Sequence, residues 1–235
     1  MIDYNCYLGY WPFYKLSANF EDLKKAHEKN NIEYGYVSSL QSIFYNDSYE
    51  SEKDLYNEIK GSNYKQVTII NPTLPSAPVI LKRCVDEFKI AGVKLMPGYH
   101  KYTLSNKLLK PILDIVKEYN LYLFITLRVH HNLFFDYIVP DEIDCDTING
   151  ILKENPEIRL VVNYANIPAM RIFKEEMSKN PNAAADISAF TGNLFETDEE
   201  ITKNLVFGSS YPLSSVGTLK ILADKYSNIF TPKEI

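Results

Sequence analysis

Two long cations stand at or just beyond β-rich runs of this sequence, where parallel-sheet proteins place ligand-binding groups. Lys94 lies within VKLM, and Arg128 directly follows LYLFITL. A cation inside a fold is costly unless it is paired, so two interpretations stay open. Either these cations pair with carboxylates such as Asp3 and Asp186, or they bind the carboxylate or phosphate of a ligand.

Three of the four histidines follow the same two runs. His100 lies in PGYHKY, and His130 and His131 lie in RVHHN. Residues that follow neighbouring strands can meet, and imidazole titrates near neutral pH, so His100 and His130 are candidates for general acid–base catalysis. The alternative for each is a loop histidine that only forms hydrogen bonds. The fourth, His27, lies among charged residues, and we expect it at the protein surface.

Eight short runs rich in β-branched and aromatic residues recur along the chain, separated by helix-length segments. Strands that alternate with helices imply a parallel sheet, because a parallel connection needs a crossover. Eight such units close into a (β/α)8 TIM-like barrel, with a doubly wound open sheet as the alternative. The expected strands are residues 3–8, 34–39, 66–71, 93–96, 121–127, 160–164, 185–189 and 205–209.

Helix signals support the same organisation. The expected helices include residues 20–31, 77–92, 108–120 and 141–156. Serine precedes three of them, and glycine or proline ends two, as helix boundaries favour. No linker, repeat or low-complexity tract interrupts the series, so we expect one domain over 1–235. The final TPKEI (231–235) resembles a helix cap and first turn, so the last helix is expected to be incomplete or the sequence truncated.

Alternation along each strand assigns side chains to the barrel interior, since residues i and i+2 share a face. The active site of such a barrel lies at the carboxyl ends of the strands. The interior residues expected from the first strand are Asp3, Asn5 and Tyr7, while Tyr4 and Cys6 are expected to face the helices as packing. The later strands are expected to contribute Lys94, Met96, Thr126, Arg128, Tyr164, Asp186, Ser188 and Ser210.

The composition indicates a cytoplasmic globular protein. Of 235 residues, 46% are hydrophobic, which is enough for one sizeable core. The net charge of −5 argues against nucleic acid or an anionic membrane as partner, and no apolar run approaches the roughly 20 residues of a membrane span. Cys6, Cys84 and Cys145 are too widely spaced for a disulfide framework or a Cys-x-x-Cys zinc site. A homo-oligomer stays open.

Five motifs stand in order at the first, second, third, fourth and eighth expected strands. They are IDYNCYLGYWPF, SSLQSIFYND, VTIINPTLP, GVKLMPGYHKY and LVFGSSYP. Together they resemble the amidohydrolase superfamily, specifically its amidohydrolase 2 group of metal-dependent hydrolases and decarboxylases. The resemblance extends over nearly the whole chain. It implies a TIM barrel with its active site at the mouth, in agreement with the strand pattern.

The metal ligands that the resemblance implies are replaced in this chain. The family places His-x-His on its first strand, single histidines on its fifth and sixth, and the aspartate of Gly-Ser-Asp on its eighth. The residues at those positions are Asn5 and Tyr7, Thr126, Tyr164 (or Asn163, one register away) and Ser210. Amide and hydroxyl oxygens hold zinc poorly. No metal ligand is therefore assigned, and zinc or another divalent metal is disfavoured as a cofactor.

The replacing side chains are polar, as in a site that still binds a ligand. The pyrone dicarboxylate lactonases of this superfamily work without a metal, and they bind the carboxylates of their substrate through cationic side chains. By that resemblance we expect a metal-independent hydrolase of a small carboxylated or lactone-type ester. The substrate-binding residues would be Asn5, Lys94, Thr126, Arg128 and Ser210, and the catalytic residues Tyr7, Tyr164, His100 and His130, with the tyrosines polarising the carbonyl and the histidines moving the proton.

Two other hypotheses stay open. The family's aspartate base is absent here, so the barrel could be a pseudo-enzyme that binds a small anionic ligand without converting it. Alternatively, the chain could be a hydrolase with a non-standard metal site, built from His100, His130 or His131 and a carboxylate such as Asp136.

Overall fold

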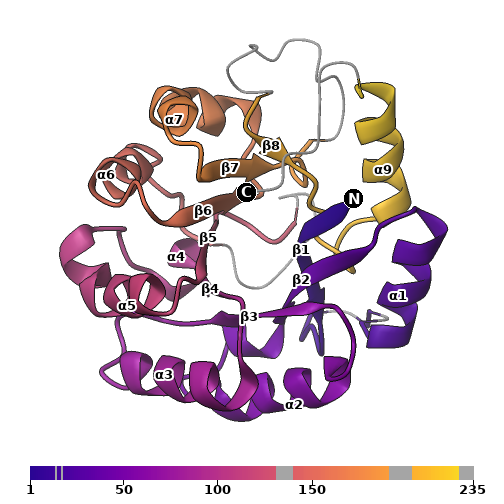
Figure 1. Cartoon of the computed structure of the whole chain (residues 1–235), viewed down its shortest axis with the longest axis horizontal. Helices are drawn as coiled ribbons and strands as arrows, with labels where there is room; N and C mark the ends of the chain where they lie inside the picture. The colour runs from indigo at the N-terminus through magenta and orange to yellow at the C-terminus, as the bar shows by residue number, and fades with distance from the viewer. Residues whose placement is uncertain (14, 17, 131–139, 191–202, 228–235) are drawn as a thin grey trace.

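Eight parallel strands form one sheet, in the order in which they occur along the chain. The computed structural model describes residues 1–13, 15–16, 18–130, 140–190 and 203–227. The strands lie at the centre and the helices surround them (Figure 1). The strands are β1 (Ile2–Leu8), β2 (Tyr34–Ser39), β3 (Lys65–Ile69), β4 (Gly92–Leu95), β5 (Tyr122–Thr126), β6 (Arg159–Asn163), β7 (Ala183–Asp186) and β8 (Leu205–Val206).

Within the described residues, helices connect the successive strands from β1 to β7, as parallel pairing requires, and a further helix follows β8. They are α1 (Phe20–Lys29), α2 (Tyr49–Ile59), α3 (Ala77–Phe88), α5 (Asn106–Glu118), α6 (Asp146–Glu154), α7 (Ile167–Lys179) and α9 (Val216–Lys225), with a 3-10 turn η1 (Gln41–Ile43) after β2 and a short α4 (Pro97–His100) after β4. Within the described ranges, no helix has the length and apolar character that a membrane crossing needs. The TPKEI segment (231–235) lies outside the described residues.

The sheet closes into a barrel through backbone hydrogen bonds between β1 and the residues that follow β8. The Tyr4 amide donates to the Phe207 carbonyl, and the Tyr7 amide donates to the Tyr211 carbonyl, each at 2.8 Å. The sequential strand order and this closure confirm the predicted (β/α)8 barrel. A doubly wound open sheet, in which the strand order reverses at a switch point, is excluded.

Capping side chains explain where several helices begin. The Ser105 hydroxyl accepts a hydrogen bond from the Leu108 amide at 3.3 Å, so α5 begins two residues before the predicted position. The Asn166 side chain caps α7 in the same way, through the Ala169 amide at 3.0 Å. Such caps satisfy amide groups that have no partner inside the helix. The helix predicted from residue 141 begins only at Asp146.

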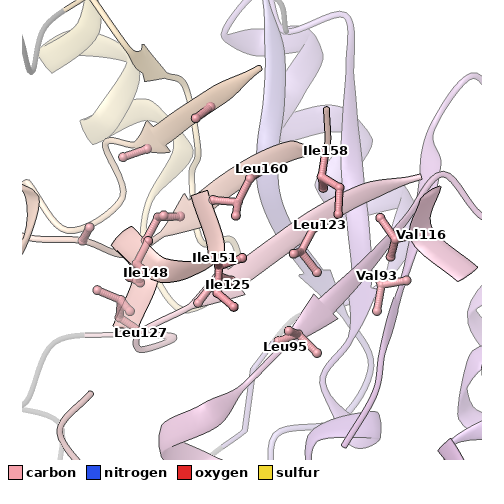
Figure 2. Close-up of a cluster of buried hydrophobic side chains, with 14 of the residues drawn as sticks. Val93, Leu95, Val116, Leu123, Ile125, Leu127, Ile148, Ile151, Ile158 and Leu160 are labelled. Carbon is pink, nitrogen blue, oxygen red and sulfur yellow. The ribbon is translucent and has the colours of Figure 1, made fainter. Parts of the chain in front are cut away.

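The main apolar core lies between the outer face of the strands and the surrounding helices. Figure 2 shows part of it, where side chains of β4, β5 and β6 pack against those of α5 and α6. The strand residues in this view include Val93, Leu95, Leu123, Ile125 and Leu160, and the helix residues include Val116, Ile148 and Ile151. Burial of one such side chain contributes about 1.5–3 kcal/mol, and the alternation in sequence predicts which residues take part.

Two further apolar layers fill the barrel interior. The lower layer is rich in aromatic residues, and the Tyr4 and Tyr36 rings stack in it with centroids 5.0 Å apart. The upper layer lies toward the mouth and consists of Tyr7, Trp11, Leu40, Ile43, Ile69, Met96, Val129 and Leu213. The Lys94 ammonium lies 4.2 Å from the Tyr7 ring centroid in the upper layer and 5.6 Å from that of Phe124 in the lower layer. A polar layer thus separates the two apolar ones.

The first strand breaks the predicted alternation. The pairing register of β1 and β2 shifts between Asp3 and Cys6, so that Tyr4 joins the interior aromatic layer. Asp3 faces α1 instead, where Oδ2 lies 3.1 Å from His27 Nε2. The prediction that Asp3 points inward and Tyr4 outward is therefore wrong, because a bulge adds a residue to one strand. The outward position of Cys6 is confirmed by its packing against Leu23 and other residues of the helix layer.

The prediction that His27 lies at the surface is also wrong. His27 is 0% exposed, and its Nδ1 lies 2.9 Å from the Tyr64 hydroxyl. Leu23 and His27 are the two buried residues of α1. Their spacing of four places them on the same helix face, which packs on the barrel although most of the other residues of α1 are charged.

Candidate functional site

A chain of polar side chains crosses the barrel interior near the carboxyl ends of the strands. We call it the strand-end network; it consists of Lys94, Asn5, Ser188, Asp186, Asn163 and Thr126, all of them buried. The Lys94 ammonium donates to Asn5 Oδ1 at 2.9 Å. The Asn5 amide group donates to Ser188 Oγ at 3.4 Å, and the Ser188 hydroxyl donates to Asp186 Oδ1 at 2.6 Å.

The network continues on the other side of the same carboxylate. The Asn163 amide group donates to Asp186 Oδ2 at 2.9 Å, and the Thr126 hydroxyl donates to Asn163 Oδ1 at 3.2 Å. The backbone amides of Tyr164 and Ser188 add two more hydrogen bonds to Asp186 Oδ1, at 2.9 and 3.0 Å. Burial raises the pKa of Asp186, and these donors oppose that shift.

Lys94 has a neutral hydrogen-bond partner. Its side chain is 1% exposed, and burial lowers its pKa to about 8, while the nearby Cys6, Asp186 and Asp3 oppose the shift. The direct partner is the Asn5 amide and not a carboxylate, so of the two interpretations left open by the sequence, direct pairing with Asp3 or Asp186 does not hold for this cation. The Tyr7 ring face adds cation–π stabilisation.

Tyr7 carries a buried hydroxyl at the top of this layer. Among the described residues, no group meets hydrogen-bond geometry with the Tyr7 hydroxyl. Burial raises the pKa of Tyr7 well above its usual value, and the neighbouring Thr126 hydroxyl opposes the shift. The phenol therefore stays protonated, and its hydroxyl has an unused hydrogen bond to offer.

On β6 the interior residue is Asn163, one position before the residue first aligned with the family's histidine. Tyr164 follows the strand with a φ of 58°, a left-handed conformation that L-residues seldom adopt. This backbone turn takes Tyr164 out of the alternation, and its side chain lines a cavity at the mouth. Asn163 joins the strand-end network in its place.

The cavity lies beyond the ends of β5 and β6 and has a volume of about 430 Å³. We call it the rim cavity. Its polar lining consists of Arg128, Asp141, Glu142, Cys145, Tyr164 and Asn166. Arg128 follows β5 and is partly exposed. Burial raises the pKa of Tyr164, and the positive charge of Arg128 opposes the shift.

Two predicted site residues thus meet in the rim cavity, and the other four polar lining residues escaped the site prediction. Arg128 and Tyr164 are the predicted ones. Asp141, Glu142 and Cys145 fall in the expected helix 141–156, which in fact begins later, and Asn166 was not assigned to any site. The available signal for Asn166 was its position two residues after the expected strand 160–164 and two residues before Pro168, which is typical of a helix cap followed by proline in the first turn.

The two described candidate histidines occupy separate surroundings. His100 Nε2 lies 3.0 Å from the Ile43 carbonyl oxygen, and burial lowers the pKa of His100. The His130 ring packs edge-on against Trp11 with centroids 5.7 Å apart. The described lining of the rim cavity includes neither ring. His131 and Asp136, which completed the non-standard metal site, lie outside the described residues.

Ser210 links the end of β8 to the end of β5. Its hydroxyl donates to the Val129 carbonyl at 2.5 Å, and its amide donates to the Asn5 carbonyl at 2.6 Å. Its φ of 52° is left-handed. The side chain that stands where the family has its aspartate is therefore buried and engaged with backbone.

The strand-end residues do not suit the divalent metal that the resemblance implies. Asn5, Tyr7, Thr126, Asn163 and Ser210 offer only amide and hydroxyl groups, which bind such ions weakly. The one carboxylate of the network, Asp186, already accepts four hydrogen bonds. The Lys94 ammonium lies in the same layer and would repel a second cation. We therefore assign no chemical step there to a metal.

A different set of metal-binding side chains lies on the outer side of β1. Asp3, Cys6 and His27 place a carboxylate oxygen, a thiol and an imidazole nitrogen within 4.8 Å of one another. All three residues are buried, and their position is separate from the mouth of the barrel.

The sequence matches no protein-family model and no curated protein, whereas solved structures match it well. An uncharacterized TIM-barrel protein from Bordetella bronchiseptica is 15% identical, with a TM-score of 0.68 over 99% of this chain and 92% of that chain. Amidohydrolase 2 from Bifidobacterium longum subsp. infantis is 10% identical, with a TM-score of 0.62 over 96% and 91%.

A third similar structure carries a metal. The 5-carboxyvanillate decarboxylase from Novosphingobium aromaticivorans, complexed with manganese, is 11% identical, with a TM-score of 0.63 over 90% of this chain and 77% of that chain. At these identities the likeness concerns the fold. The chain thus has the barrel fold of amidohydrolase structures, as its sequence motifs predicted.

Proposed function

We propose that the protein is an amidohydrolase-related hydrolase that works without a divalent metal on a small carboxylated ester or lactone. The observation that carries the proposal is that Arg128 and Tyr164, at the ends of the adjacent strands β5 and β6, line one cavity. A guanidinium binds a carboxylate through two parallel hydrogen bonds. A phenol beside it can donate a hydrogen bond to the carbonyl oxygen of the scissile bond.

The chemistry assigns distinct roles to the lining residues. Arg128 binds the substrate carboxylate, and Tyr164 stabilises the oxyanion that forms on the attacked carbonyl. Asp141 or Glu142 accepts a proton from water as the oxygen of that water bonds to the carbonyl carbon. The ester C–O bond then breaks, and the departing oxygen takes the proton. The sequence suggested His100 or His130 as the general base. We assign this role to Asp141 or Glu142 instead, because these carboxylates line the cavity.

The same lining restricts the substrate. One guanidinium and two carboxylates face the cavity, so a ligand with several negative charges would meet repulsion from Asp141 and Glu142. A monocarboxylate with a neutral lactone or ester group suits the lining better. Asn5, Tyr7, Lys94, Thr126 and Ser210 are buried and are not among the lining residues of the cavity, so they would not touch this substrate.

A second function is favoured by the closed state of the strand-end network. Its members satisfy one another with hydrogen bonds and are buried. At most of the strand-end positions that carry chemistry in the resembled family, the side chains of this chain are thus already engaged in hydrogen bonds. On that ground, the rim cavity would bind the same monocarboxylate ligand without converting it, as in a pseudo-enzyme.

One experiment separates the two functions. Purified protein is incubated with a panel of monocarboxylated lactones and esters in the presence of a chelator, and hydrolysis is followed by liquid chromatography. Binding of the same compounds is measured by calorimetry. Turnover with chelator present supports the hydrolase, and binding without turnover supports the pseudo-enzyme. Turnover that requires added metal would contradict the proposal, and so would the absence of both binding and turnover.

A further inference from the structure

Three side chains of types that bind zinc meet between β1 and α1. We call Asp3, Cys6 and His27 the outer-wall cluster. Their ligand atoms lie within 4.8 Å of one another, and each residue is 0% exposed. Carboxylate, thiolate and imidazole are the three ligand types that zinc prefers in proteins. The cluster lies on the helix-facing side of the barrel wall, because Cys6 packs in the helix layer and His27 belongs to α1.

Local backbone features bring these residues together. Residues three apart on a regular strand point to opposite faces. The register shift between Asp3 and Cys6 places both on the helix side. On α1, His27 shares the inward face with Leu23. The cluster therefore depends on a bulge in β1, a feature that families retain for function rather than as a defect.

A glycine leaves room beside the cluster. A Cβ at Gly35 of β2 would lie 2.7 Å from Cys6 Sγ and 3.1 Å from His27 Cε1. Both distances are shorter than ordinary carbon contacts. Any other residue at this position would push the thiol and the imidazole aside. The glycine therefore leaves the space in which both groups can face Asp3.

Outer hydrogen bonds orient two of the three side chains. Asp3 Oδ1 accepts from the Asn5 and Ser209 amides at 3.0 and 2.9 Å, which directs Oδ2 toward His27. His27 Nδ1 lies 2.9 Å from the Tyr64 hydroxyl, which directs Nε2 toward Asp3. Metal-binding histidines and carboxylates are held by partners of this kind, because the partners fix the ring and raise its basicity.

The distances suit a metal site as well as a simple hydrogen bond. Asp3 Oδ2 and His27 Nε2 are 3.1 Å apart, close to the roughly 3.3 Å between two ligands bound tetrahedrally at about 2.0 Å. Cys6 Sγ lies 3.3 Å from the Tyr36 carbonyl oxygen. Rotation of the Cys6 side chain would turn the sulfur toward the ion, and the Tyr36 carbonyl oxygen or a water would supply the fourth ligand. The two negative charges of the carboxylate and the thiolate would neutralise the two positive charges of a zinc ion. A neutral site is less costly to bury than a charged one.

We propose that Asp3, Cys6 and His27 bind one zinc ion that fastens β1 to α1. Binding releases the thiol proton and moves the imidazole proton from Nε2 to Nδ1, where the Tyr64 oxygen accepts it. Because the cluster is buried, the ion enters as the chain folds. The site is structural and does not rest on the hydrolase proposed for the rim cavity.

The test uses the three cysteines of the chain, Cys6, Cys84 and Cys145. The double variant Cys84→Ser/Cys145→Ser keeps Cys6 as its sole thiol. This variant is unfolded with chelator, refolded with cobalt(II) or zinc(II), and freed of unbound ion by gel filtration. We expect a thiolate-to-cobalt charge-transfer absorption and about one retained ion per chain. Adding Cys6→Ser should abolish the absorption, and His27→Gln should weaken retention at least tenfold.

A second readout is independent of these variants. Wild-type protein refolded with zinc should melt at a higher temperature than protein refolded with chelator, because an ion that binds only the folded chain stabilises it. The double variant decides the case even where Cys6→Ser does not fold. No cobalt charge-transfer absorption together with equal melting temperatures would overturn the proposal and leave Asp3 and His27 as a hydrogen-bonded pair.

Discussion

Lys94 donates a hydrogen bond of 2.9 Å to the Asn5 amide oxygen inside the barrel. The two residues stand on β4 and β1, and Asn5 occupies a position where the resembled family has a metal-binding histidine. The side chain of Lys94 thus supplies a fixed positive charge in the layer where that family holds metal ions. A neutral amide at residue 5 suits this pairing, since its oxygen accepts a hydrogen bond from the ammonium without adding charge.

The stability of the protein should depend on the protonation of Lys94. Burial lowers its pKa to about 8, whereas an unfolded lysine titrates near about 10.4. Between these values the unfolded state holds a proton that the folded state lacks, so folding becomes more favourable as pH rises. The full effect is on the order of 3 kcal/mol. The buried thiols Cys6, Cys84 and Cys145 act in the opposite sense in this range, because burial raises their pKa. We therefore expect the effect of Lys94 as a difference: the free energy of unfolding of wild type, measured by urea denaturation, should rise between pH 8 and 10 relative to that of a variant without the Lys94 charge.

The matched variant is Lys94→Met, which removes the charge and keeps the length of the side chain. The wild-type free energy of unfolding minus that of Lys94→Met should increase between pH 8 and 10, since the thiols contribute equally to both proteins. The difference between wild type and Lys24→Met, which alters an exposed lysine of α1, should stay constant over this range. Parallel curves for wild type and Lys94→Met would show that Lys94 titrates outside this range. Measurements stop at pH 10, because unfolded tyrosines begin to titrate there.

Removing the Tyr7 hydroxyl tests whether this buried group has a hydrogen-bond partner that stabilises the fold. The hydroxyl is buried, and no described group satisfies hydrogen-bond geometry with it. Tyr7→Phe keeps the ring under the Lys94 ammonium and removes only this oxygen. The free energy of unfolding should stay within about 1 kcal/mol of wild type or rise, since a buried unpaired polar atom is costly. A loss of more than about 2 kcal/mol in urea denaturation would reveal a partner for the hydroxyl.

Sequence patterns predicted the barrel because each strand repeats a simple signal. Val93 and Leu95, or Ile125 and Leu127, alternate with polar residues, and their outward faces form the main core. The errors arise where the backbone departs from regular geometry. The β1 bulge reverses Asp3 and Tyr4, and no residue type in IDYNCYL signals a bulge.

The membership of the strand-end network was more predictable than its connections, whereas most polar residues of the rim cavity were missed. Alternation placed Lys94, Thr126 and Asp186 inside, as observed. It could not show that Lys94 pairs with Asn5, because that contact joins strands 89 residues apart in sequence. The left-handed backbone of Tyr164 likewise depends on tertiary contacts. For His27 a signal existed, since Leu23 lies one helical turn earlier on the same face.

Arg128 should matter for ligand binding more than for folding. Arg128→Gln keeps much of the side-chain length and removes the charge that we propose to bind the substrate carboxylate. Loss of a charge-assisted bidentate contact should weaken binding of a monocarboxylate by roughly tenfold to a hundredfold, measured by calorimetry. Arg171→Gln, on an exposed position of α7, is the control and should bind as wild type does. Equal affinities for the two variants would remove Arg128 from the ligand site.

The close approach of Gly208 to Asp186 leads to the last prediction. A Cβ at residue 208 would lie 2.6 Å from Asp186 Oδ2 and 2.7 Å from Asp186 Cβ, and the carboxylate is held by four hydrogen bonds that it would have to break to move. Gly208→Ala should therefore lower the free energy of unfolding by about 2–4 kcal/mol. Gly150→Ala is the matched control: it lies inside α6, a Cβ there meets nothing within 4 Å, and alanine favours a helix by about 0.5–1 kcal/mol over glycine. Urea denaturation of both variants should thus shift the midpoint in opposite directions. A Gly208→Ala protein as stable as wild type would mean that the Asp186 side of the strand-end network can move, and a network that yields so readily would be open to ligands rather than a fixed part of the barrel.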